Sequence, residues 1–507
     1  MKKNTTYSRT RAQESTDAIQ RLFVTMRHLF NRGFYKPMGV SGETLREALL
    51  TLSPEIYGSI AQEKVELDGL LYVIDRLPQG IEECRYINLT SDEGYSDTHF
   101  TPIIPPKRRR NCYRIDAEQM NIEITRGRSE IYDILTHITF LFIESHKIMK
   151  QVLINEKGDV NRDWQKLEVA VLQTENLTKD EREIALSHTA NILGRTFKEV
   201  SGVYAKFSSA AKPERFLDII YWLGKLALDE ILLENKRTVT FSSVLRETLG
   251  QHIHGEQWAD SIKAVLHTQG LLKRPIHIIS ANMHSVQNSL YAPETLKTKL
   301  KGQNKLQIFE ELSANSKHRD TVAKVATKEG MTFIKDESGT NIDVQIFDTA
   351  KYSSGDYATK IKNLDDADKP VIVVMDYAFG EQAYETMDEL LKPYKSNDDT
   401  AIYLNVSSIS IMGKAGILTG GKGDIMIPSS HIFEGTADNY PFENGLKIAD
   451  LKGHDIGVYD GAMISVLGTS LQNKDLLRYF NRSTWGVVGL EMEGAHYQKA
   501  IQAHSKV

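Results

Sequence analysis

The pattern of apolar and polar positions changes character about halfway along the chain. In the first half, apolar residues recur every three or four positions, which is the spacing of one helix face. Within 15–30, for example, Ile19, Leu22 and Met26 fall on one such face. Residues 80–115 interrupt this pattern with prolines and mixed polar content. The same spacing predicts further helices over 129–153, 181–206, 213–233 and 242–271.

From residue 273 onward, short apolar runs of strand length replace the helical spacing. One of these runs precedes a helix that carries Ala383, Met387 and Leu390 on one face, and residues 495–503 can form a helix after the last run. The predicted strands cover 275–281, 341–347, 370–375, 401–406 and 486–490.

Strands that alternate with helices favour a parallel or mixed sheet with helices on both of its faces. A chain of 507 residues is long enough for two or three domains. We therefore predict an α/β protein with two domains. A mainly helical domain of unknown role over 1–272 precedes a three-layer α/β/α domain over 273–507.

Composition and charge exclude several classes of function. The net charge is −5, so no overall positive field would attract nucleic acid or an anionic membrane. The two cysteines, Cys84 and Cys112, lack metal-ligand spacing and suit a reducing compartment without a disulfide framework. Apolar clusters such as 138–143 are too short to span a bilayer, and no signal peptide core follows the basic N-terminus. We expect a cytoplasmic protein without a metal site or cofactor.

Three polar clusters in the first half could carry chemistry, and each has a simpler interpretation. The basic run 107–110 could contact a phosphate, but such runs more often form a solvated loop or pair with acids elsewhere in the fold, and we prefer that interpretation. His137 and Glu144 lie on one predicted helix but lack the His-Glu-x-x-His pattern of zinc enzymes. His252 and His254 are alternate residues, and on a helix such residues do not face one ligand.

Glu493 lies in the stretch 485–497, where a short apolar run gives way to a helix. In open α/β folds, ligands bind at the carboxyl edge of the sheet, where such a transition occurs. A carboxylate there can accept two hydrogen bonds from a vicinal diol, and the Met492 thioether is an adaptable surface for a sugar face. The alternative is a solvated glutamate at a helix start, where the helix dipole favours it.

A glycine loop precedes this stretch in the sequence. Residues 405–410 form a strand-like run that leads into the glycine-bearing segment 411–418, and a Gly-Asp pair at 423–424 opens another apolar run. This order, with Glu-Met-Glu-Gly at 491–494, resembles the nucleoside phosphorylase and nucleosidase superfamily. That superfamily includes purine nucleoside phosphorylase, methylthioadenosine/S-adenosylhomocysteine nucleosidase and AMP nucleosidase. Each motif is weak alone, and their order and spacing over residues 273–507 carry the resemblance.

The resemblance implies a substrate site built from three segments. The glycine loop approaches the base and the ribose, where a side chain would block that approach. Residues 465–469 contact the base, and the Met-Glu pair holds the ribose. Lys414 departs from the pattern, because relatives usually carry a small hydroxyl residue at that position. The implied substrate-binding residues are Gly413, Lys414, Ala415, Gly416, Val466, Thr469, Met492 and Glu493.

The resemblance also implies where the reaction would be catalysed. Near the exit of the first strand, nucleosidases of this superfamily hold a water-activating glutamate, and phosphorylases hold a phosphate-binding arginine nearby. This chain offers His284 and Ser285 instead, which makes them the catalytic candidates. Asn282 and Gly380 are the candidate phosphate contacts, Gly380 because free N–H groups at a helix start attract anions.

A second departure concerns the proton donor. In relatives, a further strand after the Met-Glu helix brings an aspartate that protonates the purine as the glycosidic bond breaks, and such general acid assistance is worth roughly 10²–10⁴-fold in rate. Here Glu493 is followed by residues 494–507, enough for a helix and no strand. We expect either that the chain continues past Val507 or that the domain lacks its last strand and the donor.

Three hypotheses follow. The first is an enzyme that cleaves the N-glycosidic bond of a purine nucleoside or nucleotide, with water or phosphate as acceptor. The second is a catalytically impaired nucleoside or nucleotide sensor whose helical domain signals to a partner. The third is a likeness of fold alone, with a different small ligand. By analogy with the superfamily we expect a homo-oligomer that binds a small molecule rather than nucleic acid or membranes.

Overall fold

The computed structural model describes residues 10–172, 177–208, 212–300, 302–395, 400–436 and 438–505. The chain forms two compact units that interleave in the sequence. The first unit comprises Met1–Gly250, Leu418–Asn439 and Glu443–Val488. The second comprises Gln251–Ile417, Tyr440–Phe442 and Gly489–Val507. The predicted domains are contiguous, and their boundary at residue 272 stays a prediction.

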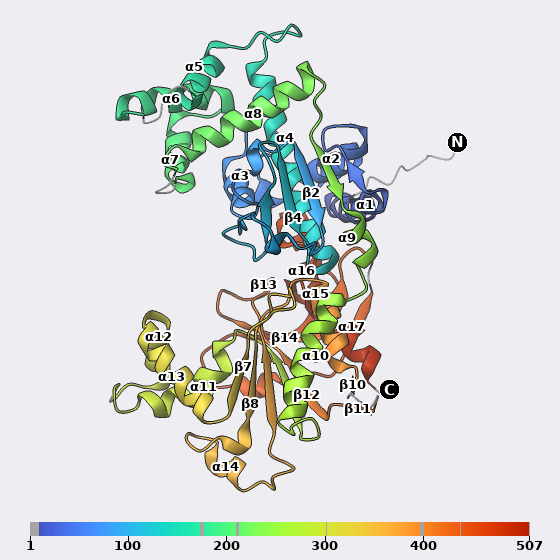
Figure 1. Ribbon diagram of the computed structural model, residues 1–507, viewed down its shortest axis with the longest axis vertical. Helices are drawn as coiled ribbons and strands as arrows, with labels where there is room; N and C mark the ends of the chain where they lie inside the picture. The colour runs from blue at the N-terminus through green and yellow to red at the C-terminus, as the bar shows by residue number, and fades with distance from the viewer. Residues whose placement is uncertain are drawn as a thin grey trace, which may run out of the picture. The chain divides into compact units, whose positions relative to one another are not determined.

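Helices make up much of the first unit (Figure 1). Its three longest helices confirm the predicted helices over 15–30, 129–153 and 213–233. No helix in the described part of the chain combines the length and the apolar content needed to cross a lipid bilayer. The helices of this unit are α1 (Arg11–Arg32), α2 (Val40–Leu52), α3 (Leu67–Ile74), α4 (Gly127–Val152), α5 (Arg162–Leu172), α6 (Lys179–Leu193), α7 (Phe197–Phe207), α8 (Arg215–Leu232), α9 (Ser243–Thr248) and α16 (Lys474–Arg482).

Two predicted helices are each divided in the structure. The predicted helix over 181–206 becomes α6 and α7, because Gly194 adopts a left-handed φ of 62° and ends α6. Thr196 then caps α7 in a capping box with Glu199. The predicted helix over 242–271 becomes α9 and the second unit's α10 (Ile253–Thr268), with Gly250 at a φ of 88° between them.

The first unit also contains sheets, which the sequence pattern did not reveal. Three short strands, β2, β4 and β5, pair in parallel, and β1 and β3 pair antiparallel at the two edges. A second parallel pair joins β14 and β16. The strands are β1 (Phe34–Tyr35), β2 (Tyr86–Thr90), β3 (Cys112–Arg114), β4 (Gln119–Glu123), β5 (Thr238–Phe241), β14 (Ile425–Phe433) and β16 (Val458–Ser465).

A five-stranded sheet of order β12-β6-β9-β8-β7 forms the centre of the second unit. Strands β12, β6 and β9 are parallel, whereas β8 runs antiparallel to both of its neighbours. These strands are β6 (Ile276–Ser280), β7 (Met331–Ile334), β8 (Val344–Asp348), β9 (Val371–Met375) and β12 (Val406–Ile411). The remaining strands, of which β15 and β17 are shared between the two units, are β10 (Tyr394–Lys395), β11 (Ala401–Ile402), β13 (Gly416–Ile417), β15 (Asn439–Pro441) and β17 (Val487–Glu491).

The predicted strand over 401–406 is wrong in its placement. Residues 401–402 form β11, which pairs with β10, and the strand that joins the central sheet is β12, over 406–411. The physical reason is that β12 is an edge strand whose residues are half-buried or exposed, so it lacks the continuous apolar run of a buried strand.

Helices cover both faces of this sheet (Figure 1). One apolar core joins the sheet to α10, α15 and α17, and a second joins its other face to α11, α12 and α13. This layered arrangement confirms the α/β class. The remaining helices of the unit are α11 (His284–Leu296), α12 (Lys305–Ala314), α13 (Ser316–Lys328), α14 (Ala358–Lys362), α15 (Gln382–Leu391) and α17 (Gly494–His504).

Two helical glycines of the first unit allow a matched test of its packing. A Cβ on Gly224 of α8 would lie 2.6 Å from a ring carbon of Trp164 and 2.8 Å from a methyl group of Ile148. We expect Gly224→Ala to destabilise the unit by roughly 1–3 kcal/mol through overpacking. Gly202 of α7 has nothing within 4 Å of that position, so Gly202→Ala should stabilise it by about 0.5–1 kcal/mol. Urea unfolding measures both, and equal midpoints for the two variants would contradict this packing.

Candidate functional site

The three parallel strands of the second unit end at one level. Ser280 at the end of β6 lies opposite Met375 of β9 and Ile411 of β12. The chain then leaves β6 into α11, on one face of the sheet, and leaves β9 into α15, on the other face. Adjacent parallel strands whose connections leave to opposite faces form the crevice in which open α/β sheets bind ligands.

Helix α17 is anchored to this edge by side-chain and backbone hydrogen bonds. The hydroxyl groups of Tyr497 and Ser280 lie 2.9 Å apart. The Gly380 N–H, five residues after the end of β9, donates to Glu493 Oε1 at 2.9 Å. The start of α17 therefore lies at the carboxyl ends of β6 and β9, and the Glu493 carboxylate is held at the edge by backbone.

Two neighbouring glutamates bind different backbone groups at the start of α17. The Glu491 carboxylate accepts the N–H groups of Glu493, at 2.5 Å, and of Gly494. Glu491 thus satisfies the free amides at the helix start, where a negative charge is favoured. The half-buried Glu493 side chain can then turn towards Gly380. Glu493 is therefore not the solvated glutamate of the alternative interpretation.

Burial changes the acidity of two groups in the first turn of α17. Burial raises the pKa of Glu493 to about 7, and the nearby Glu491 adds repulsion, while the Gly380 hydrogen bond acts in the opposite direction. Burial also lowers the pKa of His496 to about 4, so its imidazole is neutral at physiological pH. At neutral pH, Glu493 populates both protonation states and can accept hydrogen bonds or exchange a proton.

The glycine loop lies beside the end of β17. Gly416 pairs with Leu490 in an antiparallel register, one step from the pair between Ile417 and Gly489. The chain that precedes Gly416 therefore runs towards the Glu491–Glu493 end of β17. A Cβ on Gly413 would lie 3.9 Å from the ring of Tyr377, a residue that follows β9. Lys414 in this loop is exposed, and Ala415 is half-buried.

The candidates at the exit of β6 stand at the same edge of the sheet. Asn282 Oδ1 accepts the N–H of His284 at 3.0 Å, and the Asn282 carbonyl accepts the N–H of Ser285 at 2.9 Å. His284 is exposed and Ser285 is half-buried. Asn282 therefore shapes the start of α11 as well as offering its amide to solvent.

Val466 and Thr469 belong to the first unit, whereas the other predicted site residues belong to the second. Val466 is buried directly after β16, and Thr469 is exposed. Between them, the Leu467 N–H donates to Glu434 at 3.2 Å. The assignment of Val466 and Thr469 to the base stays a prediction.

Sequence reasoning missed Glu434. It is buried directly after β14, accepts hydrogen bonds from Leu467 and from Gln472 Nε2 at 3.3 Å, and burial raises its pKa to about 7. The available signal was an acidic residue between a strand and Gly435, the same pattern that singled out Glu493.

The polar clusters of the first half form structural ion pairs. Arg108 binds both carboxylate oxygens of Asp133, at 2.9 and 2.8 Å, and Arg110 binds Asp133 at 2.9 Å. His137 lies 3.2 Å from the same carboxylate and 3.0 Å from the Tyr57 hydroxyl. Two of the basic residues in 107–110 are therefore partners for an acid in the fold, as the simpler interpretation predicted.

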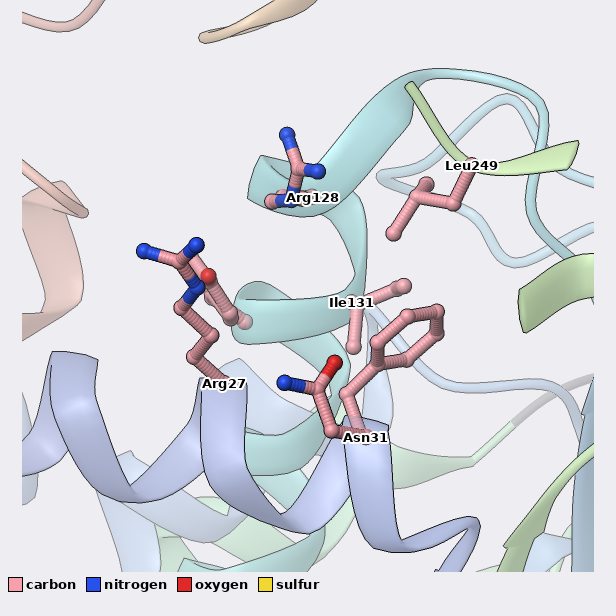
Figure 2. Close-up of a pocket in the computed structure, with 7 residues that line it drawn as sticks. Arg27, Asn31, Arg128, Ile131 and Leu249 are labelled. Carbon is pink, nitrogen blue, oxygen red and sulfur yellow. The ribbon is translucent and has the colours of Figure 1, made fainter. Parts of the chain in front are cut away.

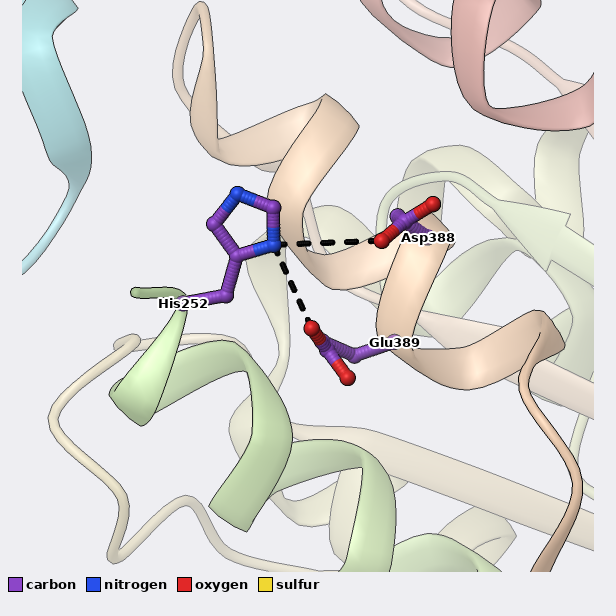
Figure 3. Close-up of side chains that lie close together, drawn as sticks. All are labelled: His252, Asp388 and Glu389. Atoms are coloured by element: carbon purple, nitrogen blue, oxygen red, sulfur yellow. Dashed lines mark hydrogen bonds and ion pairs between the residues drawn. The ribbon is translucent and has the colours of Figure 1, made fainter. Parts of the chain in front are cut away.

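His252, Asp388 and Glu389 come together although the sequence separates them (Figure 3). Each could offer one metal-ligand atom, and these atoms lie within 4.8 Å of one another. However, the Lys392 ammonium lies 2.6 Å from Glu389 Oε1 and 3.2 Å from Asp388 Oδ2. His504 Nε2 lies 2.9 Å from the other Asp388 oxygen. The cluster is a network of ion pairs that joins α10, α15 and α17.

Comparisons with known proteins identify a family. The family model "Family of unknown function (DUF6909)" matches residues 43–299 and 305–507, and the chain belongs to this family. No curated protein matches the chain. A solved futalosine hydrolase mutant of Helicobacter pylori is similar at 12% identity and a TM-score of 0.26, over 45% of this chain and 84% of that one. A methylthioadenosine/S-adenosylhomocysteine nucleosidase of Colwellia psychrerythraea, in complex with adenine, is similar at 12% identity and a TM-score of 0.23, over 46% of this chain and 77% of that one.

The ion-pair network predicts a specific role for Lys392. Lys392→Met leaves two carboxylates facing each other, so we expect a lower melting temperature, equivalent to about 0.5–1 kcal/mol because the ammonium is half-exposed. Lys360→Met, which changes an exposed lysine of α14, is the control and should melt like the parent protein. An unchanged melting temperature for Lys392→Met would contradict the network.

Proposed function

We propose that the carboxyl edge of the second unit's sheet binds a purine nucleoside or nucleotide and cleaves its N-glycosidic bond. The observation that carries the proposal is the half-buried Glu493 carboxylate, which the Gly380 N–H holds at the edge where the parallel strands end. A vicinal diol donates two hydrogen bonds, and a carboxylate fixed by backbone is a suitable acceptor for both. The glycine loop runs beside β17, and its glycines carry no side chain that would block the approach of a planar base.

In this proposal each segment of the edge has one role. Glu493 accepts the ribose hydroxyl groups, and Met492 contacts the sugar face. Residues 413–416 shape the base site within the second unit. Asn282 offers its amide to the attacking water or phosphate. The Gly380 N–H already donates to Glu493, so the same group is not available to a phosphate. In this proposal Gly380 therefore positions the carboxylate.

In this proposal the protein stabilises positive charge on the sugar and forms no covalent intermediate with it. As the glycosidic bond lengthens, positive charge develops on the ribose ring. The ionised Glu493 stabilises that charge most effectively where water is excluded, which its half-burial supports. His284 or Ser285 then directs the water or phosphate to the opposite face of the sugar.

One observation favours the alternative, a nucleoside-binding sensor that does not turn over. Among the described residues, neither the His284 imidazole nor the Ser285 hydroxyl has a hydrogen-bond partner. Catalytic groups are usually held in place by neighbouring side chains. A site with a fixed sugar acceptor and an unfixed catalytic pair can bind its ligand without cleaving it.

Release of free base tests the proposal directly. Purified protein is incubated with AMP, adenosine, inosine and methylthioadenosine, with and without phosphate, and free base is measured by chromatography. We expect turnover of at least one compound. Glu493→Gln should lower kcat/KM by roughly 10–100-fold, because it removes a charge-assisted acceptor. Glu294→Gln, an exposed change on α11 in the same unit, is the control.

The outcomes separate the two functions. Binding by calorimetry without base release would support the sensor. Binding and turnover that are both unaffected in Glu493→Gln would contradict any role of this carboxylate in holding the sugar. Loss of both activities in Glu294→Gln as well would point to damaged folding rather than to the site.

A further inference from the structure

We infer that His252, Asp388 and Glu389 of the second unit form a binding site for a divalent transition-metal ion such as Zn²⁺ (Figure 3). In the described part of the chain, this is the one group of at least three histidine, cysteine or acidic residues whose donor atoms all lie within 4.8 Å of one another. By contrast, arginine, asparagine, tyrosine and apolar side chains line the cavity of about 80 Å³ in the first unit (Figure 2). The metal site shares no residue with the proposed nucleoside site and is independent of it.

The spacing of the three donor atoms suits a single ion. His252 Nδ1 lies 3.2 Å from Glu389 Oε1 and 3.8 Å from Asp388 Oδ2. In a tetrahedral site with bonds of about 2.0–2.1 Å, neighbouring donor atoms are about 3.3 Å apart. The two distances in the structure lie on either side of that value, so small side-chain rotations bring all three atoms within bonding reach of one ion.

The types of donor atom select the class of metal. An imidazole nitrogen suits Zn²⁺ and other late first-row ions, whereas Mg²⁺ and Ca²⁺ prefer oxygen ligands alone. Figure 3 shows that His252 Nδ1 faces both carboxylates and that the other ring nitrogen points away. When that other nitrogen carries the proton, the Nδ1 lone pair faces two negative groups, and a cation between them is needed to hold this arrangement.

Backbone and ring contacts hold His252 in position. It precedes α10 in the left-handed conformation, with a φ of 53°, which side chains other than glycine rarely adopt. Its ring packs edge-on against Tyr384, with the ring centroids 5.6 Å apart. Tyr384 is one turn before Asp388 on α15, so this contact fixes the imidazole beside the last turn of that helix. Strained residues of this kind cluster at functional sites.

Neighbouring groups also hold the two acidic residues in place. His504 Nε2 lies 2.9 Å from Asp388 Oδ1, the oxygen that does not face His252. Lys263 Nζ donates to the Glu389 backbone carbonyl at 2.6 Å. In metal sites, partners that orient a ligand in this way change the affinity by about 10–100-fold. The ligand side chains are therefore arranged before an ion binds.

Lys392 competes with such an ion for its ligands. The Lys392 ammonium lies 2.6 Å from Glu389 Oε1 and 3.2 Å from Asp388 Oδ2, which are the same two oxygens that face His252. The carboxylates therefore already bind a positive charge at this position. The Lys392 side chain is 44% exposed, and ion pairs of exposed side chains are weak. A doubly charged ion with an additional imidazole ligand can displace this ammonium into solvent.

Calorimetric titration of the full chain with ZnCl₂, after dialysis against a chelator, tests the inference. We expect one saturable Zn²⁺ site per chain in the parent protein. Binding should weaken about 100-fold or more in His252→Asn and in Glu389→Gln, because each removes a ligand. Asparagine tolerates the left-handed backbone, so His252→Asn removes the imidazole without new strain. The matched control is His267→Asn, which changes an exposed histidine of the same helix and should bind like the parent.

A third variant, Lys392→Met, should change the affinity in the opposite direction, which damaged folding does not do. Removal of the competing ammonium should tighten Zn²⁺ binding about two- to fivefold, the equivalent of the weak ion pair that the metal displaces. No saturable binding to the parent protein would overturn the inference. Equal affinity in the parent, His252→Asn and Glu389→Gln, or weaker binding in Lys392→Met, would also overturn it. Circular dichroism checks that each variant is folded.

Discussion

The hydrogen bond from the Gly380 N–H to the Glu493 carboxylate ties together the parts of the second unit on which its proposed function depends. Gly380 belongs to the connection that follows a central strand, and Glu493 stands at the start of the last helix. Glu491 satisfies the free amides at the start of that helix, which leaves the Glu493 carboxylate available for this bond. It places an acceptor where the parallel strands end, and burial there raises the pKa of the carboxyl to about 7, so that both protonation states are populated at neutral pH.

Much of this edge could be predicted from the sequence. The apolar runs over 275–281 and 370–375 contain β6 and β9, and the change from strand to helix near Glu493 places the residue correctly between β17 and α17. These features are local, because they depend on hydrophobic periodicity and on where it changes. The placement of Glu493 at a sheet edge therefore follows from local sequence and requires no knowledge of distant contacts.

The parts that could not be predicted depend on contacts between distant residues. The partnership of Gly380 with Glu493, and that of His252 with Asp388 and Glu389, joins residues more than one hundred positions apart. The sheet of the first half escaped prediction because its strands have only two to five residues, and helices separate β1 from β2 and β4 from β5. The edge strand β12 was indicated by the strand-like run over 405–410, but the strand predicted over 401–406 was misplaced because exposure weakens the apolar signal of an edge strand. Folding also makes Arg108 and Arg110 partners of Asp133, although these residues lie more than twenty positions apart in the sequence.

The most direct test of the central claim is an NMR titration of the Glu493 side chain. In protein labelled with ¹³C at glutamate carboxyl carbons, Glu493→Gln identifies the Glu493 signal by its disappearance, which separates it from Glu434. We expect that signal to titrate with a pKa of about 7, and to titrate lower when adenosine is bound, because diol hydrogen bonds favour the ionised form. A pKa near the ordinary value of about 4.3, unchanged by the nucleoside, would contradict a buried carboxylate that holds a sugar.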